Sequence, residues 1–145
     1  GITISAHVAG MYACSPLFGL LADRVGRRWT LALGFVVQLA SLGLLIAYGQ
    51  RDAAVVAALV LLGLGWSAAL VSCSTLLIDA APATRRTHIQ GRSDFTMNIV
   101  GASGGAVAGP IVHNWGMPTL ASLTGFLIIV AVVVLLPRVR DISTR

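Results

Sequence analysis

Five apolar runs, each long enough to cross a lipid bilayer as a helix, constrain this 145-residue chain more than any other feature. The runs cover residues 2–21, 30–49, 53–78, 95–112 and 119–136. A helix needs about 20 apolar residues to cross a bilayer core, and each unpaired backbone group in lipid costs several kcal/mol. The alternating pattern of a membrane β-barrel is missing from these runs. The sequence therefore predicts an all-α polytopic membrane protein with five transmembrane helices.

Charge is scarce in this chain, and its distribution predicts an orientation. Charged residues make up 10% of the sequence, against about a quarter in soluble domains, which excludes a soluble globular protein. The junctions 22–29 and 79–94 and the tail 137–145 contain three arginines each, whereas Arg51 is alone on the opposite side. The positive-inside rule places those three segments, and so the C-terminus, in the cytoplasm. This orientation accounts for the net charge of +5, and no nucleic-acid partner is expected.

The first residues and the two cysteines carry no targeting or metal-binding pattern. Gly1 leads directly into an apolar run, without the basic flank or cleavage site of a signal peptide, and we expect a fragment of a longer protein. Cys14 and Cys73 lie within apolar runs at no metal or redox spacing, which predicts buried reduced thiols. Neither a metal nor a cofactor is expected.

The five runs differ in polarity. The runs 30–49 and 119–136 are almost purely apolar, whereas the other three contain most of the polar residues. Polar side chains in a membrane usually face protein or a wet cavity, so three central helices and two peripheral helices are expected. The candidates for a substrate or proton pathway are His7, Tyr12, Trp66 and Asn98. Packing remains the alternative for His7 and the two aromatic residues, and an interhelical hydrogen bond is the alternative for Asn98.

The run 95–112 also has a stripe of small residues. Gly101, Gly105 and Gly109 recur at intervals of four and predict one helix face on which another backbone packs closely. Asp79 and Asp94 lie at the expected cytoplasmic ends of the neighbouring helices, where capping is the default role. Asp94 is also a candidate for a second gate, acting with the basic residues of the junction 79–94.

The junction between the first two runs has the most specific pattern in the chain. Gly26 permits a tight reversal, while the arginines reach lipid phosphate. A basic cytoplasmic turn would explain these residues but leaves Asp23 unexplained, because a carboxylate at the membrane edge needs a cationic partner or a helix N-terminus. The pattern reads Gly19-x-x-x-Asp23-Arg24-x-Gly26-Arg27-Arg28.

This pattern resembles the signature loop of the major facilitator superfamily, and all six defining positions are present. The resemblance implies a six-helix half-bundle of which this chain contains five helices, with 30–49 and 119–136 as the peripheral third and sixth. It also implies a cytoplasmic latch between the motif and the other half. The expected fourth-helix Arg is absent from Leu61-Leu-Gly-Leu-Gly65, and Gly105-x-x-x-Gly109-Pro110 matches only part of the antiporter signature. We therefore read helices 8–12, from the C-terminal half.

The resemblance implies secondary active transport of a small solute by alternating access. The expected partners are the solute, the lipid bilayer and the N-terminal half of the same transporter. A bacterial inner membrane is the expected location, and no enzymatic activity is expected. Proton coupling is expected as well, although no carboxylate lies mid-helix, so within this chain the coupling would depend on His7.

One alternative belongs to a different class of protein. Gly101-Ala-Ser103-Gly104 and the sequence around His7 resemble pieces of the rhomboid intramembrane serine protease site. That chemistry needs a serine on one helix and a histidine on a later one. Here His7 comes before Ser103, and His113 lies at the far end of the same run. The transporter is therefore the favoured interpretation.

Overall fold

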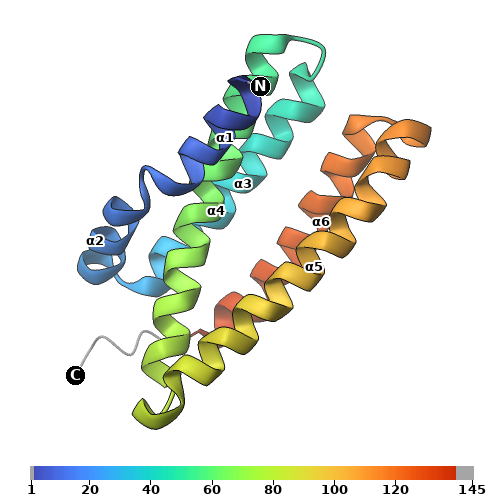
Figure 1. The fold of residues 1–145 in the computed structure, drawn as a ribbon. Coiled ribbons are helices and arrows are strands. Elements are labelled where there is room, and N and C mark those ends of the chain that lie inside the picture. The colour runs from blue at the N-terminus through green and yellow to red at the C-terminus, as the bar shows by residue number, and fades with distance from the viewer. Residues whose placement is uncertain (1, 140–145) are drawn as a thin grey trace.

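The computed structural model describes residues 2–139 and is built from helices (Figure 1). In the described part, five helical segments are long and apolar enough to cross a membrane, which agrees with the predicted fold class. The first of these segments contains both α1 and α2. The elements in order are α1 (Ile2–Tyr12), α2 (Ser15–Val25), α3 (Arg27–Tyr48), α4 (Asp52–Ala80), η1 (Ala83–Arg85), α5 (Arg86–Trp115), α6 (Met117–Leu135) and η2 (Leu136–Arg138).

The first membrane segment is not the single helix that the run 2–21 predicts. It breaks at Ala13 and Cys14, between α1 and α2. Pro16 is the physical reason, because it has no N–H to donate to the carbonyl of Tyr12 one turn earlier. Hydropathy does not register this break, since both sides of it are apolar.

The predicted cytoplasmic loop 79–94 is largely helical. The segment that connects α4 to α5 is short, and α5 already begins at Arg86, before the predicted start at residue 95. The helix is longer than the apolar run because hydropathy marks only the apolar residues, whereas polar residues such as Gln90 continue the helix. Asp94 consequently lies within α5, and Asp79 lies in the last turn of α4. A carboxylate cannot cap a helix at either place, so the capping roles were wrong as well.

The helix α4 is the centre of the packing. It contacts α1, α2 and α3, and its contact with α3 is the most extensive in the described structure. Glycines allow these contacts to be close, since a Cβ on Gly34 of α3 would lie 2.8 Å from the carbonyl oxygen of Gly65 on α4. On the other side of α3, a buried cluster of Leu42, Leu45, Ala58 and Ala121 joins α3 and α4 to α6.

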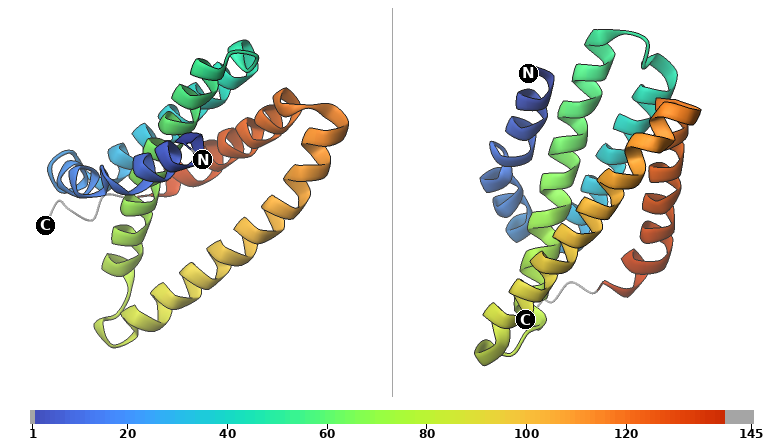
Figure 2. Two further views of the ribbon diagram at one scale, coloured as in Figure 1. Left: turned by 45° about the horizontal axis from the view of Figure 1, so that its top comes forward. Right: turned by 45° about the vertical axis from the view of Figure 1, so that its right-hand side comes forward.

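The helix α5 lies apart from this group. Figure 2 shows α5 leaving α4 near their shared end and diverging from it along its length, and no residue of α5 is buried. A Cβ on Gly101, Gly105 or Gly109 would meet no described atom within 4 Å. Among residues 2–139, α3 is thus more central than α5, contrary to the order expected from polarity. Only segments outside the described residues could make α5 a central helix.

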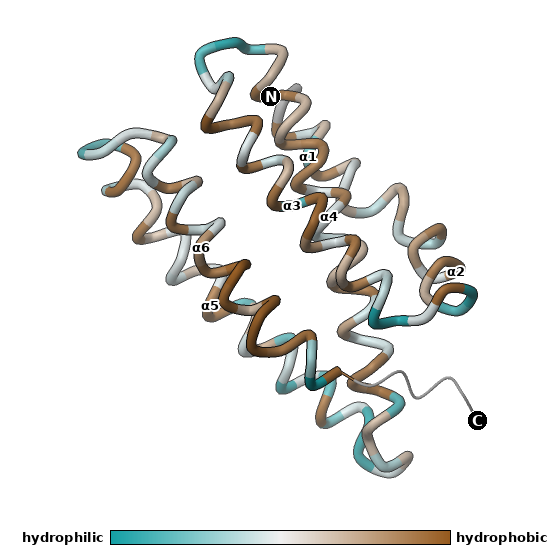
Figure 3. The backbone as a smooth tube through the Cα atoms, turned by 180° about the vertical axis from the view of Figure 1, so that it is seen from behind, coloured by the Kyte–Doolittle hydropathy of each residue, from teal (hydrophilic) through white to brown (hydrophobic). Residues whose placement is uncertain are grey.

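The hydropathy of the backbone follows the membrane pattern. In Figure 3 the helical segments are mostly hydrophobic, and the hydrophilic residues concentrate at the turns. The α2–α3 turn and the α4–α5 turn belong to the arginine-rich side defined by the sequence. The residues of the signature motif lie at the turn between two of the candidate membrane-spanning segments.

Candidate functional site

Gly26 makes the sharp turn between α2 and α3. Its backbone has φ 103° and ψ 144°, a conformation that side chains disfavour, so glycine is required there. The Gly26 amide donates to the Ala22 carbonyl over 3.1 Å, which closes α2. Its carbonyl accepts from the buried Thr30 hydroxyl at 3.1 Å, which opens α3. The predicted role of Gly26 as a tight reversal is confirmed.

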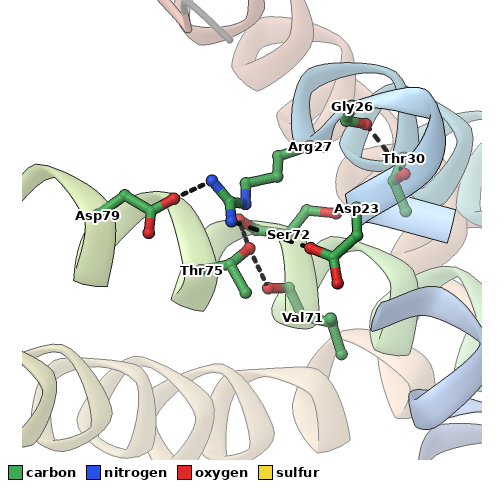
Figure 4. A network of polar contacts seen from close by, with 8 residues as sticks. All are labelled: Asp23, Gly26, Arg27, Thr30, Val71, Ser72, Thr75 and Asp79. Atoms are coloured by element: carbon green, nitrogen blue, oxygen red, sulfur yellow. Dashed lines mark hydrogen bonds and ion pairs between the residues drawn. The ribbon is translucent and has the colours of Figure 1, made fainter. Parts of the chain in front are cut away.

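Arg27 joins this turn to α4. Its guanidinium donates to the Asp79 carboxylate and lies 3.9 Å from the Asp23 carboxylate, so one cation bridges two acids (Figure 4). The Arg27 and Asp79 side chains are 20% and 30% exposed, whereas the Asp23 side chain is 68% exposed. The better-shielded contact between Arg27 and Asp79 is therefore the stronger of the two. We call these three residues the charge cluster.

The partner of Asp23 was expected in the other half of the transporter, and the charge cluster changes that expectation. Within the described residues the guanidinium of Arg27, a member of the same motif, lies 3.9 Å from the Asp23 carboxylate. Asp79 was missed as a site residue. The sequence did contain a signal for Asp79, because an acid in the last turn of a helix is disfavoured by the helix dipole and needs a basic partner. The positive-inside pattern had already placed the motif arginines at the same membrane face.

The remaining motif residues lie around the charge cluster. Arg24 is exposed at the end of α2. The Arg28 guanidinium lies 6.0 Å from the centre of the Trp29 ring, within cation–π range at the expected interface. A Cβ on Gly19 would meet nothing within 4 Å among the described residues. Gly19 therefore supports no close helix contact in this part of the protein.

His7 makes a hydrogen bond between two helices. Its Nδ1 lies 2.7 Å from the Leu59 carbonyl oxygen on α4. A carbonyl only accepts, so Nδ1 carries the proton and Nε2 is left to another partner. This hydrogen bond gives His7 a packing role between α1 and α4. Its Nε2 atom is still available to a proton or a solute. Nearby, the rings of Tyr12 and Trp66 meet edge to face, with centroids 6.3 Å apart and planes at 71°.

A cavity of about 340 Å³ separates the middle of α4 from α5. Its lining includes Trp66, Cys73, Ser74, Asp94 and Met97. Cys73 is exposed and Cys14 is partly exposed, so neither thiol is buried among the described residues as predicted. Of the four pathway candidates, the structure thus brings together Tyr12 and Trp66.

Asn98 does not bridge helices in the described structure. Its side-chain amide donates to the backbone carbonyl of Asp94, one turn earlier on α5, over 2.8 Å. Asp94 in turn accepts from the Gln90 side chain at 2.8 Å. The expected interhelical bond is absent among residues 2–139 because α5 diverges from its neighbours at this level.

Comparison with known proteins identifies the family of this chain. The family model described as Major Facilitator Superfamily matches residues 1–144. The chain belongs to this superfamily. The predicted resemblance is therefore confirmed, and the protein is an integral membrane protein.

Three relatives in the superfamily illustrate its range. An uncharacterized MFS-type transporter of Bacillus subtilis, YddS, is 38% identical over 86% of this chain and 29% of its own length. The riboflavin transporter RfnT of Brucella anthropi is 30% identical, over 94% of this chain and 34% of its own length. The 4-hydroxybenzoate transporter PcaK of Pseudomonas aeruginosa is 34% identical, over 97% of this chain and 31% of its own length. The chain thus spans about a third of these superfamily members, and no solved structure matches it.

Superfamily membership favours the transporter over the protease. In the described structure His7 donates to Leu59 on α4, while Ser103 is exposed on α5. His113 and Ser103 share one continuous helix, ten residues apart. These positions give no support to a serine–histidine pair, which requires a hydrogen bond between the two side chains.

Proposed function

We propose that this chain is part of a transporter that moves a small solute across the membrane by alternating access. Membership of the superfamily supports this proposal, as do relatives whose names include riboflavin and 4-hydroxybenzoate. Such transporters bind their substrate near the bilayer midplane between two structural repeats and rock around it. We take the present chain as helices 8–12 of the C-terminal half, with the N-terminal half as its partner.

The charge cluster is the observation that carries the proposal. Arg27 connects the α2–α3 turn to the end of α4, two places that can separate only if its contact with Asp79 breaks. Asp23 is mostly exposed, so one side of its carboxylate remains open to a group outside the described residues. In our proposal the cluster is a latch that keeps the cytoplasmic side closed, and its opening accompanies the change of access.

The solute contacts are proposed on the middle parts of the helices. Trp66 lines the cavity and its ring meets that of Tyr12 edge to face, an aromatic surface that suits a solute with an apolar or aromatic body. Asn98 and the Nε2 atom of His7 supply polar contacts on other faces. His7 is also the proposed proton carrier, because its bond to Leu59 uses Nδ1 and leaves the Nε2 atom of the imidazole available. The proposed location is a bacterial inner membrane with a cytoplasmic tail.

The latch is tested by removing its acids in the full-length transporter. Asp79→Asn should keep membrane insertion but weaken a partly shielded contact of about 1 kcal/mol, which shifts a two-state equilibrium about fivefold. We expect impaired transport or increased cytoplasmic accessibility, and a smaller effect from Asp23→Asn because Asp23 is more exposed. Asp52→Asn, at the opposite end of α4, is the matched control. Wild-type transport and accessibility in Asp79→Asn would refute the latch.

A further inference from the structure

The two halves of the first membrane segment are attached to α4 in different ways. The half formed by α1 lies backbone to backbone on α4, because a Cβ on Gly63 would lie 2.5 Å from the His7 carbonyl oxygen. A Cβ on Gly10 would likewise lie 2.9 Å from the Val60 carbonyl oxygen. The hydrogen bond from His7 to Leu59 adds a polar contact beside this crossing. The helix α1 is therefore fixed on α4 by close packing.

The half formed by α2 is attached mainly at its two ends. Ala22 is its only buried residue, and a Cβ on Gly19 would meet no described atom within 4 Å. At its start, the Ser15 hydroxyl lies 2.9 Å from the Ser67 hydroxyl on α4. Just beyond its end, Arg27 contacts Asp79. Two polar contacts thus hold α2 to α4, whereas close backbone packing holds α1 to α4.

The break between the two halves removes the usual resistance to bending. Pro16 donates no hydrogen bond, and the amides of Leu17 and Phe18 both turn back to the Cys14 carbonyl. Bending at Ala13 and Cys14 therefore sacrifices no regular helix hydrogen bond across the break. Figure 1 shows the change of direction between α1 and α2 at this point.

A chain of hydroxyl groups fastens the break to α4. The Ser15 hydroxyl donates to the Met11 carbonyl over 3.0 Å, so the proton between the two serines comes from Ser67. The hydrogen bonds run from Ser67 to Ser15 and then to Met11, which connects α4 to both sides of the break. Ser67 is 1% exposed, so water does not replace its bond in the closed arrangement.

We propose that α2 is a pivoting arm, with its joint at Ala13 and Cys14 and the Ser67–Ser15–Met11 hydrogen bonds as its clasp. When Arg27 leaves Asp79, the clasp opens and α2 swings away from α4, while α1 remains in place. This proposal rests on the proposed latch, for which it supplies the moving part. It assigns a positioning role to Ser15 and Ser67, which do not contact the charge cluster.

The pivot is tested with pairs of spin labels in the full-length transporter in lipid, after replacement of Cys14 and Cys73 by alanine. Cysteines at Leu20 and Ile78, which are 56% and 36% exposed, report the separation of α2 from α4. A second pair, at Ile4 and Ala53, reports the separation of α1 from α4. Electron–electron double resonance then gives the distance distribution for each pair.

Two serine variants on α4 form a matched comparison. Ser67→Ala should raise the ratio of long to short α2–α4 distances about threefold to twentyfold, the range for an interhelical hydrogen bond in a membrane. Ser72→Ala should leave the ratio unchanged, because Ser72 is equally buried but donates to Ala68 on its own helix. Pro16→Ala should lower the ratio, since its new backbone N–H can donate to the Tyr12 carbonyl and stiffen the break. The α1–α4 distances should stay constant in all three.

Three results would overturn the pivot. The first is an equal effect of Ser67→Ala and Ser72→Ala on the α2–α4 distances. The second is a matching change in the α1–α4 distances, as for a rigid helix, and the third is α2–α4 distances that stay fixed in Ser67→Ala. Transport by Asp79→Asn separates this failure from that of the latch. Wild-type transport in Asp79→Asn refutes the latch even if α2 pivots, whereas fixed α2–α4 distances refute the pivot even if the latch holds.

Discussion

Gly34→Ala tests the close backbone contact between α3 and α4. A Cβ at this position would lie 2.8 Å from both the Gly65 carbonyl oxygen and the Ala69 amide nitrogen on α4. Both are backbone atoms, so no flexible side chain can move aside. Ordinary contact begins near 3.4 Å, and α3 and α4 must therefore separate by about 0.6 Å where their interface is most extensive.

The cost follows from two opposing terms. Overpacking of this kind destabilises a protein by about 1–3 kcal/mol, while replacing a helical glycine with alanine stabilises the helix by about 1 kcal/mol. The net loss of stability is then only about 0–2 kcal/mol, which is too small to be read without a reference. Gly43→Ala supplies that reference, because Gly43 lies on the same helix and its Cβ would meet nothing within 4 Å.

The difference between the two variants isolates the packing term. We expect Gly34→Ala to be less stable than Gly43→Ala by about 1–3 kcal/mol, or about 5- to 150-fold in the unfolding constant. The measurement is reversible unfolding of the full-length transporter in mixed detergent micelles, followed by tryptophan fluorescence, with Trp66 on α4 as a local reporter. Equal stability of the two variants would show that α3 and α4 do not pack through Gly34.

Substitutions at three further positions test other parts of the structure. Gly26→Ala should destabilise the protein by about 1–3 kcal/mol in a thermal unfolding assay, because φ 103° is strained for any side chain. His7→Ala should cost about 1 kcal/mol by losing the bond to Leu59, and His7→Gln should recover part of it with its amide donor. A Cβ on Gly105 would meet no described atom within 4 Å, so lower stability of Gly105→Ala in the full-length protein would reveal a packing partner outside residues 2–139.

The sequence was sufficient for the membrane class because backbone in lipid must satisfy its own hydrogen bonds, and an apolar run of about 20 residues does so as a helix that crosses the bilayer. The motif likewise predicted the turn at Gly26, since a reversal this short needs a backbone that only glycine adopts readily. Hydropathy could not locate the break at Ala13 or the early start of α5. Both depend on local hydrogen bonds, which Pro16 removes in one case and Arg86 to Asp94 continue in the other.

The partner of Arg27 was harder to predict because it depends on tertiary geometry. Three polar contacts join the first segment and its turn to α4, namely His7 to Leu59, Ser15 to Ser67, and Arg27 to Asp79, and each spans 52 residues. A constant offset is what two parallel segments with equal rise per residue produce. No pattern in either segment alone contains that offset. It follows from the length of α3 and its turns, which return the chain to the level where it started.

The same register makes a charge swap possible between Arg27 and Asp79. In the double variant Arg27→Asp with Asp79→Arg, the new arginine on α4 would face the carboxylates at positions 23 and 27, so one cation again bridges two acids. Each single variant should open the cytoplasmic side in accessibility measurements on the full-length transporter. The double variant should close it again, with a coupling free energy of about 1 kcal/mol for contacts this exposed. A double variant no better than the worse single variant would mean that the two side chains do not act on each other, and Asp23 would then need a partner in the other half.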